Sequence, residues 1–473
     1  MVLKNCQGKD LLAQEALAIA RKQRIDNIEI FIQCVDVLQF AAGSTVRLTG
    51  RTFFEQGVAI RVAVNGRLGF ACGTVDTNLE TLIKNADKQA RAQIPGTRNH
   101  EKSFPAGKEI RHKESSSSDI VSLAIEDLKT IANEMMESTE LDPLAKIVES
   151  TATRNIEERL IVNSEGLFRE SVCGWITASC QAIVRRPAGE MGFGFNSLRT
   201  RDIESFDPRS VGSRAYATAM LLSNARNVPK RDQDRIRRTR RILWHPMALA
   251  QLLAHILVPT IVKRSQKPFE EQEEKQTDTF PFPTTFEVLD DPTKLELIPT
   301  YAFDDEGANT KKKTLISDGK LTTKLSAYDS HAQTNGGNNY RLQYFSERFR
   351  SFRYSPTLSP VNLFLNYTKS DYSTDLVDLC TGATIMVHRV VGANVASPTT
   401  GDFSVDATEG YLVRNRQVLF PIRKMSIAGN IYHLLKAVKA VGAMKTVQPL
   451  PSPFTINCPF MLTEKSGTSL FPA

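Results

Sequence analysis

The residues that could do chemistry are few and widely spaced. Seven histidines and seven cysteines are scattered over 473 residues. His245 and His255 are ten positions apart, whereas two zinc ligands on one helix face need a spacing near four residues. A Gly-x-Ser-x-Gly elbow, a Walker loop and His-Glu-x-x-His do not occur in the sequence. The chain therefore shows no complete catalytic site, and no nucleophile–base pair is recognisable.

Two polar segments have a functional and a structural interpretation. The stretch Asp304-Asp305-Glu306-Gly307 lacks the alternating acidic positions of a calcium loop, so a turn with polar capping is favoured. The stretch 334–339 (TNGGNN) is rich in residues that tolerate positive φ, which is typical of a loop. A backbone cradle for a peptide is the alternative there. The seven cysteines contain no Cys-x-x-Cys, and we interpret them as buried or idle thiols.

Charge and hydropathy restrict the partners. The net charge is +8, and basic residues peak at Lys230-Arg231 and between Arg235 and Arg241. No aromatic residue is interleaved there, so a solvated hinge or an interface with an acidic partner is favoured over an RNA site. No stretch resembles a membrane span or a signal peptide. We expect no nucleic-acid partner, no membrane and a cytoplasmic location.

Periodicity predicts an α+β N-terminal segment over residues 1–95. It contains a helix, a half-buried strand, a second strand, a tight turn at Asn65-Gly66 that makes a hairpin, and another helix. These elements span 10–24, 28–34, 55–62, 67–71 and 79–92, respectively. A polar linker at 93–118 follows, with two prolines and four consecutive serines.

A central α+β segment is predicted over 116–230 and a mostly β C-terminal domain over 241–473. Helical spacing from Val121 to Met135 begins the central segment. Extended stretches at 145–152, 158–163 and 166–185 and a helix at 208–224 complete it. The C-terminal domain begins with one helix and then alternates in short runs separated by Gly, Asp, Asn and Pro. We expect a disordered insertion at 265–279.

Taken in order, several short stretches resemble the TldD/TldE (PmbA) metalloprotease family along nearly the whole chain. The order and spacing of the matches carry the resemblance, because none is decisive alone. The matching stretches are 55–62 (EQGVAIRV), 66–71 (GRLGFA), 162–166 (VNSEG), 303–307 (FDDEG), 315–321 (LISDGKL), 359–363 (SPVNL), 400–405 (TGDFSV), 409–413 (EGYLV), 420–422 (FPI) and 427–430 (IAGN).

The resemblance implies one half of a heterodimeric protease, in which two similar chains enclose a cavity. TldD-type chains carry a zinc-binding His-Glu-x-x-x-His helix and a cysteine in a Cys-Gly-Lys context, whereas TldE-type chains lack the ligands. In this sequence Ala254, His255 and Pro259 occupy the three motif positions, and Cys458 has a different context. Alanine donates no lone pair, and a proline is expected to end the helix that would aim a ligand.

The chain therefore resembles TldE, and we expect no catalytic residue and no metal in it. The resemblance implies zinc in a TldD-like partner chain and unfolded peptide as substrate, held as an added β-strand. We expect an open strand edge for the peptide around Gly401, Asp402, Phe403, Glu409 and Gly410. The alternative is a stand-alone peptide-binding protein without catalytic activity.

Overall fold

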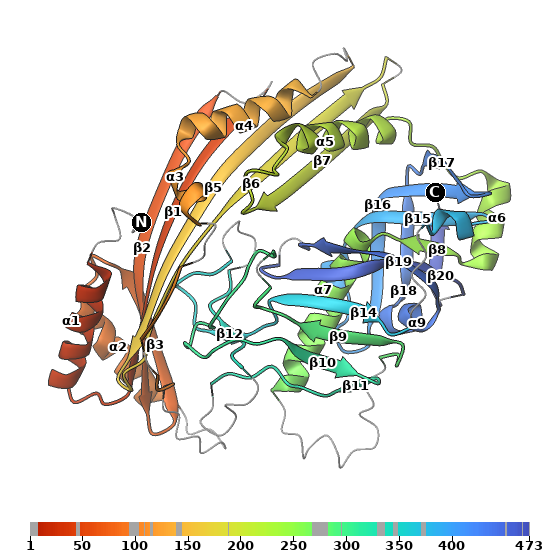
Figure 1. Ribbon diagram of the computed structural model, residues 1–473. Helices are drawn as coiled ribbons and strands as arrows, with labels where there is room; N and C mark the ends of the chain where they lie inside the picture. The colour runs from red at the N-terminus through yellow and green to blue at the C-terminus, as the bar shows by residue number, and fades with distance from the viewer. Residues whose placement is uncertain are drawn as a thin grey trace.

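The chain folds into two halves, each built on one large β-sheet (Figure 1). The protein is α+β, as predicted, and its C-terminal half is mostly β. The structure is a computed structural model, and it describes residues 8–43, 48–93, 104–107, 109–113, 117–138, 144–187, 189–266, 282–294, 296–328, 336–343, 349–369, 375–449, 452–465 and 467–472.

The N-terminal half contains a seven-stranded sheet to which both the first and the central predicted segments contribute. The strand order is β3-β2-β1-β5-β6-β4, and β7 pairs with the C-terminal part of β6. All pairs are antiparallel except β4 with β6. The strands are β1 Ile28–Ala42, β2 Thr49–Val64, β3 Arg67–Thr74, β4 Glu109–Lys113, β5 Ala145–Asn163, β6 Phe168–Arg185 and β7 Met191–Thr200.

Alternation along the strands decides what each face of this sheet covers. In β1, Ile30 and Ile32 pack with the helices at 9–22 and 79–92, and Phe40 packs in a second cluster with the helices at 125–137 and 208–222. Phe31 points to the other face and packs against Phe352 of the C-terminal half. The helices thus cover one face, and the C-terminal half lies on the concave side of the sheet (Figure 1). The helices are α1 Lys9–Lys22, α2 Leu79–Ala92, α3 Ser117–Ser122, α4 Ile125–Glu137 and α5 Pro208–Leu222.

The predicted turn and helix α2 are present, but several predicted strands and helices are joined or divided differently in the structure. Helix α2 has the predicted bounds, and Asn65-Gly66 joins β2 to β3 with positive φ at both residues, as the predicted turn requires. The predicted linker at 93–118 is wrong in part, because β4 lies within it. The predicted stretches 145–152 and 158–163 are one strand, β5, and the predicted helix over 121–135 is split into α3 and α4.

The C-terminal half contains a twelve-stranded mixed sheet. Its order is β11-β10-β9-β14-β20-β8-β15-β16-β18-β21, with β17 on β16 and β19 on β20. The strands are β8 Ile242–Trp244, β9 Phe286–Asp290, β10 Lys313–Ser317, β11 Lys320–Leu321, β14 Asn362–Tyr367, β15 Thr384–Val391, β16 Asp402–Arg414, β17 Gln417–Pro421, β18 Met425–Asn430, β19 Val438–Val447, β20 Thr455–Thr463 and β21 Ser469–Pro472; β12 Asn339–Tyr340 and β13 Thr357–Leu358 form a separate pair.

Helix α7, Pro246–Ser265, is the core helix of this half. By length and hydropathy alone it would pass as a membrane span, but most of it is buried inside the protein against the twelve-stranded sheet. The other helices are α6 Lys230–Thr239, α9 Ile431–Lys436 and the 3-10 turns Val377–Leu379 and Ala393–Val395. Beyond Gln266, the insertion predicted at 265–279 lies outside the described residues.

Among the described cysteines, one differs from the prediction. Cys180 lies in the core under α4 and α5, whereas Cys173 faces the C-terminal half, as their odd spacing on one strand requires. Cys72, Cys173, Cys180, Cys380 and Cys458 are free thiols. Cys34 is disulfide-bonded, so the interpretation of all seven cysteines as thiols is wrong for it.

Candidate functional site

Helix α7 carries the positions of the family's metal motif. His245 caps it, since its Nδ1 accepts a hydrogen bond of 3.0 Å from the backbone N–H of Met247. The helix continues past Pro259 to Ser265, so the expectation that the proline ends it is wrong. Pro259 is exposed, and the Thr260 hydroxyl lies 2.7 Å from the carbonyl of Ile256 in the same turn. The missing backbone hydrogen bond is therefore lost on the solvent side of the helix.

A cluster of polar side chains lies at the N-terminal end of α7. The ring centroids of His245 and of His388, on β15, are 3.8 Å apart. Nδ1 of His388 hydrogen-bonds to Oε1 of Glu409, on β16. The Tyr411 hydroxyl donates to the same oxygen at 2.8 Å, and Nε of Arg389 donates to Oε2 at 3.2 Å. These contacts hold the Glu409 carboxylate in one orientation.

The cluster shifts the pKa values of two of its members, Glu409 and His245. Burial alone would raise the pKa of Glu409, but the hydrogen bonds from His388 and Tyr411 and the charge of Arg389 outweigh burial and lower the pKa. Burial, together with the charges of His388, Lys445 and Arg389, lowers the pKa of His245 to about 2. His245 is therefore neutral at physiological pH, as its role as hydrogen-bond acceptor requires.

The predicted peptide-binding residues lie at two places. Gly401, with φ of +84°, makes the turn before β16, and the adjacent Asp402 is exposed. Phe403 is buried in the core. Glu409 and Gly410 lie about 23 Å further along the strand, where Glu409 belongs to the polar cluster. The structure therefore does not bring the five residues together into one site.

The open edge expected around residues 401–410 does not lie at the border of the sheet, although most of these residues have a strand partner on one side only. Strand β16 pairs with β18 over 402–406, with β15 over 406–413 and with β17 over 411–414. The carbonyl of Gly410 accepts a hydrogen bond from the N–H of Ile422. Within the described residues, the strands with a partner on one side only include β7, which pairs with β6, and β19, which pairs with β20.

Part of the concave face of the N-terminal sheet carries polar residues. Thr153 of β5, Thr177 of β6 and Gln39 of β1 occupy neighbouring register positions on it, and Gln39 donates to the Thr153 hydroxyl at 3.1 Å. A hollow of about 430 Å³ lies at the sheet's far end, lined by Val37, Gln39, Arg51, Thr52 and Phe53. Thr153 and Thr177 are only 2% and 3% exposed, so their hydroxyls pack inside the protein and do not form an open binding surface.

The segment 303–307 is buried, although sequence analysis favoured a simple polar turn. The turn is confirmed, because Oδ1 of Asp304 accepts hydrogen bonds from the N–H groups of Glu306 and Ala308. Asp305, however, accepts from Arg159 of the N-terminal sheet at 2.7 Å and also from Arg350. Burial would raise the pKa of Asp305, but the two arginines outweigh burial and lower it. This segment therefore joins the two halves.

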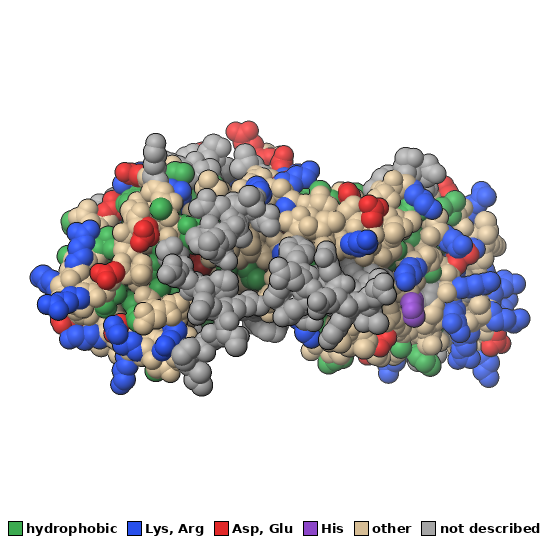
Figure 2. Space-filling model, turned by 90° about the horizontal axis from the view of Figure 1, so that it is seen from below, with side chains coloured by type: hydrophobic (Ala, Val, Ile, Leu, Met, Phe, Trp, Pro, Cys, Tyr) green, Lys and Arg blue, Asp and Glu red, His purple; other side chains and the backbone are tan. Residues whose placement is uncertain are grey.

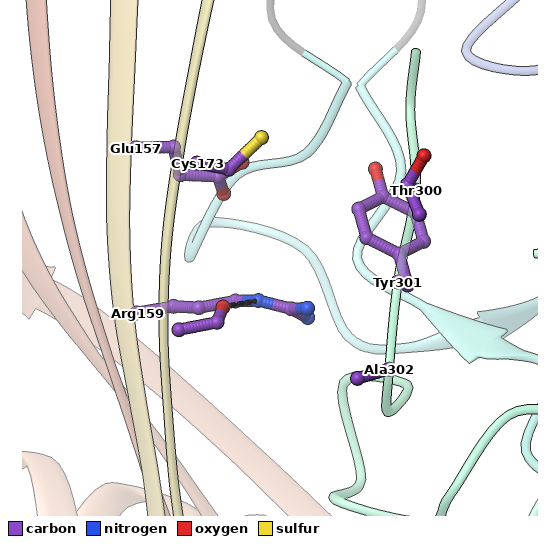
Figure 3. A pocket seen from close by; sticks show the side chains of 7 residues that line it. Glu157, Arg159, Cys173, Thr300, Tyr301 and Ala302 are labelled. Carbon is purple, nitrogen blue, oxygen red and sulfur yellow. Dashed lines mark hydrogen bonds between the residues drawn. The ribbon is translucent and has the colours of Figure 1, made fainter. Parts of the chain in front are cut away.

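A small cavity of about 10 Å³, room for one water molecule, borders this junction. Figure 3 shows side chains of β5 and β6 on one side of it and the segment 300–302 on the other; the labelled residues are Glu157, Arg159, Cys173, Thr300, Tyr301 and Ala302. The cavity is too small for a substrate, so we assign it to the junction and not to a binding site.

The basic run predicted as a hinge or an interface forms helix α6. Lys and Arg side chains gather at the right end of the molecule in Figure 2, where α6 lies. Ile236 anchors the helix in the core, and Arg414 lies 3.3 Å from Asp232. The exposed cations of the helix are Lys230, Arg231, Arg235, Arg237 and Arg238, followed by Arg240. An acidic partner for this surface stays a prediction.

Comparison with known proteins identifies the family. Models of PmbA/TldA metallopeptidase domain 1, central domain and C-terminal domain match residues 48–90, 116–222 and 237–469. The chain belongs to the PmbA/TldD metallopeptidase family. The resemblance stated from the sequence is thereby confirmed, and the metal motif of the family can be tested against the geometry of α7.

Relatives and solved structures agree with this assignment. An uncharacterised protein of Methanocaldococcus jannaschii is 24% identical over 454 residues, which is 94% of this chain and 98% of that protein. A metalloprotease of Archaeoglobus fulgidus is 29% identical over 154 residues, which is 32% of this chain and 33% of that protein. The crystal structure of TldE from Thermococcus kodakarensis is similar in fold, with a TM-score of 0.76 at 20% identity, over 97% of this chain and all of that chain.

The residues on α7 do not fit a family-type zinc ion. Ala254 has no donor atom and is 5% exposed in the core, and Pro259 offers no lone pair. His255 is half-buried between them, and burial lowers the pKa of its imidazole. In the part of the chain that the structure describes, no group of three or more His, Cys, Asp or Glu side chains is arranged to hold a metal ion.

Sequence reasoning missed most of the polar cluster. Glu409 was singled out, but His388, Arg389, Tyr411 and Lys445 were not assigned to a site. One signal was present: Glu409 and Tyr411 are two residues apart, which places both on one face of a strand. The partners of Glu409 on β15 and the approach of β19 depend on strand order, which local patterns do not contain.

Proposed function

We propose that this chain is the metal-free, TldE-like subunit of a heterodimeric zinc metalloprotease that cleaves unfolded or flexible peptides in the cytoplasm. The zinc ion and its ligands belong to a TldD-like partner chain. The observation that carries the proposal is the pair Ala254 and Pro259, because neither residue can bind a metal at the family's motif positions.

The role of this subunit is to form part of the peptide-binding wall. In the described chain, β7 and β19 each have one unpaired edge. An extended peptide can add to such an edge through its backbone, which makes recognition weakly dependent on sequence. This supports an unfolded peptide as the substrate.

Reconstitution tests the proposal. The chain is purified from its native host, co-purifying proteins are identified, and an unstructured peptide is incubated with the partner alone, with this chain alone and with both. We expect cleavage only with both chains, with zinc bound to the partner. Full activity of the partner alone would contradict the proposal. Peptide binding by a chain that has no TldD-like partner would instead support a stand-alone binding protein.

A further inference from the structure

The cationic side of the polar cluster lacks a counter-charge. Lys445 on β19 and Arg214 on α5 interact electrostatically with each other, and Lys445 also interacts with Arg389 and Glu409. Within the described residues, neither Lys445 nor Arg214 forms an ion pair with a carboxylate. Glu409 is already bound by His388, Arg389 and Tyr411. Three cations therefore converge on a region with one acidic group, which is fully engaged.

His388 and Arg389 have hydrogen-bond donors that their contacts with Glu409 do not use. Arg389 uses Nε for Glu409 and Nη2 for the carbonyl of Phe195, at 3.1 Å, and its side chain is 30% exposed. His388 uses Nδ1 for Glu409, which leaves Nε2 free, and its side chain is 24% exposed. Lys445 is exposed at the surface. Burial of its stem, and the charges of Arg214 and Arg389, lower the pKa of Lys445, as expected for a cation among cations.

The position of these cations favours the terminus of a bound peptide over the middle of that peptide. The hydrogen bond from Arg389 to Phe195 connects β15 to β7, and Arg199 of β7 bonds to Gln448 just after β19. The two halves touch at these points, so an extended peptide on the unpaired edge of β7 cannot continue straight past them. A terminus fits there better than a continuing backbone.

We propose that His388, Arg389 and Lys445 form a binding site for the C-terminal carboxylate of a peptide. A carboxylate offers two oxygens to charged donors, and such charge-assisted hydrogen bonds are the strong ones. The wall beside the site is apolar, since Met191 and Phe193 of β7 are 59% and 53% exposed on the face opposite α5. The site therefore suits a peptide that ends in an apolar residue. The inference rests on the proposed function, because it names the part of the peptide that this subunit holds.

Binding of a matched peptide pair tests the inference. An unstructured decapeptide with a fluorophore at its N-terminus is prepared as the free acid and as the C-terminal amide. Its anisotropy is measured with the full-length chain, alone and with its partner. We expect the free acid to bind at least about tenfold more tightly than the amide. Lys445→Gln, which removes one of the three proposed donors, should weaken binding of the free acid and thereby reduce this difference.

Lys439→Gln is the matched control, because Lys439 is exposed on the same strand about 20 Å away. It should keep the preference for the free acid, and acetate should compete with the free acid only. Equal affinity for acid and amide would overturn the carboxylate site and leave peptide handling intact. Equal affinity for the acid and for an amide with an internal Asp would overturn the assignment to the C-terminus. If neither form bound with or without the partner, the proposed function itself would fail.

Discussion

Nη1 of Arg61, in the N-terminal sheet, lies 2.8 Å from Oε1 of Glu306, in the C-terminal half. The same guanidinium binds Glu29 on β1 through two further nitrogens, at 2.8 and 2.6 Å. The side chains of Arg61 and Glu306 are 3% and 8% exposed. Arg341 completes the group, with Nη2 at 3.1 Å from Glu29. The two halves are thus joined by buried ion pairs, in which the guanidinium and carboxylate charges compensate each other.

Replacing Arg61 with Met should weaken this junction strongly. Glu306 would lose its cation and Glu29 would lose one of two, so buried carboxylates would be left without compensation. We expect the free energy of unfolding to fall by about 3–5 kcal/mol, measured by urea denaturation. Lys84→Met, which breaks an exposed ion pair with Glu80, is the control and should leave the midpoint unchanged. Similar midpoints for both variants would show that the junction contributes little.

Gly194→Ala should destabilise the packing of α5 on β7. A Cβ at this position would lie 1.9 Å from the carbonyl oxygen of Ala215 and 2.7 Å from the nitrogen of Ala219. Because both atoms belong to the helix backbone, the helix must move away, at a cost of about 1–3 kcal/mol. Gly382→Ala, where a Cβ meets no atom within 4 Å, serves as control in the same thermal unfolding measurement. An unchanged midpoint for Gly194→Ala would mean that α5 does not pack as described.

His245 should make the protein sensitive to mild acid. Its pKa is about 2 in the folded protein and near 6.5 in an unfolded chain, so below pH 6.5 protons bind preferentially to the unfolded state. The stability that is present above pH 6.5 is therefore lost as pH falls, by about 2 kcal/mol at pH 5. His245→Asn preserves a side-chain cap and removes this term. Unfolding at pH 7.5 and 5 should show the smaller loss for the variant, and equal losses would contradict the prediction.

The isolated chain should bind no stoichiometric zinc. Ala254 and Pro259 provide no ligands at the motif positions, and His255 alone is too weak a site to retain the ion through dialysis. Elemental analysis of the dialysed chain should give far less than one zinc per chain, while the dialysed partner retains zinc. About one zinc per chain in this protein would show that it has a metal site of its own.

His255→Ala should leave the peptidase activity of the reconstituted pair within about threefold, under ~0.7 kcal/mol of barrier. The imidazole occupies the position of the motif's glutamate, but it has no zinc-bound water in its own chain to deprotonate. Omission of the whole chain should abolish activity, because part of the cavity wall is lost. His433→Ala, at an exposed position on α9, is the control. A hundredfold loss with folded His255→Ala would mean that this residue takes part in the chemistry.

The sequence by itself determined the local elements and the missing metal ligands. Alternation from Ile28 to Cys34 indicated a strand, Asn65-Gly66 indicated the hairpin, and helical spacing predicted α2 with its observed bounds. The prediction that this strand is half-buried is wrong, because residues 28–35 of β1 are buried on both faces of the sheet. Ala254 and Pro259 argued against a zinc site whatever their surroundings. The predictions of local elements succeed because they depend on interactions within a few residues, whereas the absence of a zinc site stays a prediction.

Only the tertiary structure decided which distant residues meet. Residues 303–307 have the composition of a surface turn, yet Asp305 and Glu306 are buried, because arginines from β2 and β5 neutralise them when the halves pack. Strand β16 is paired on both sides because of the strand order of the whole sheet. Arg61 and Glu306 are 245 positions apart. Contacts of this separation depend on the packing free energy of the entire chain, and a local pattern contains no information about it.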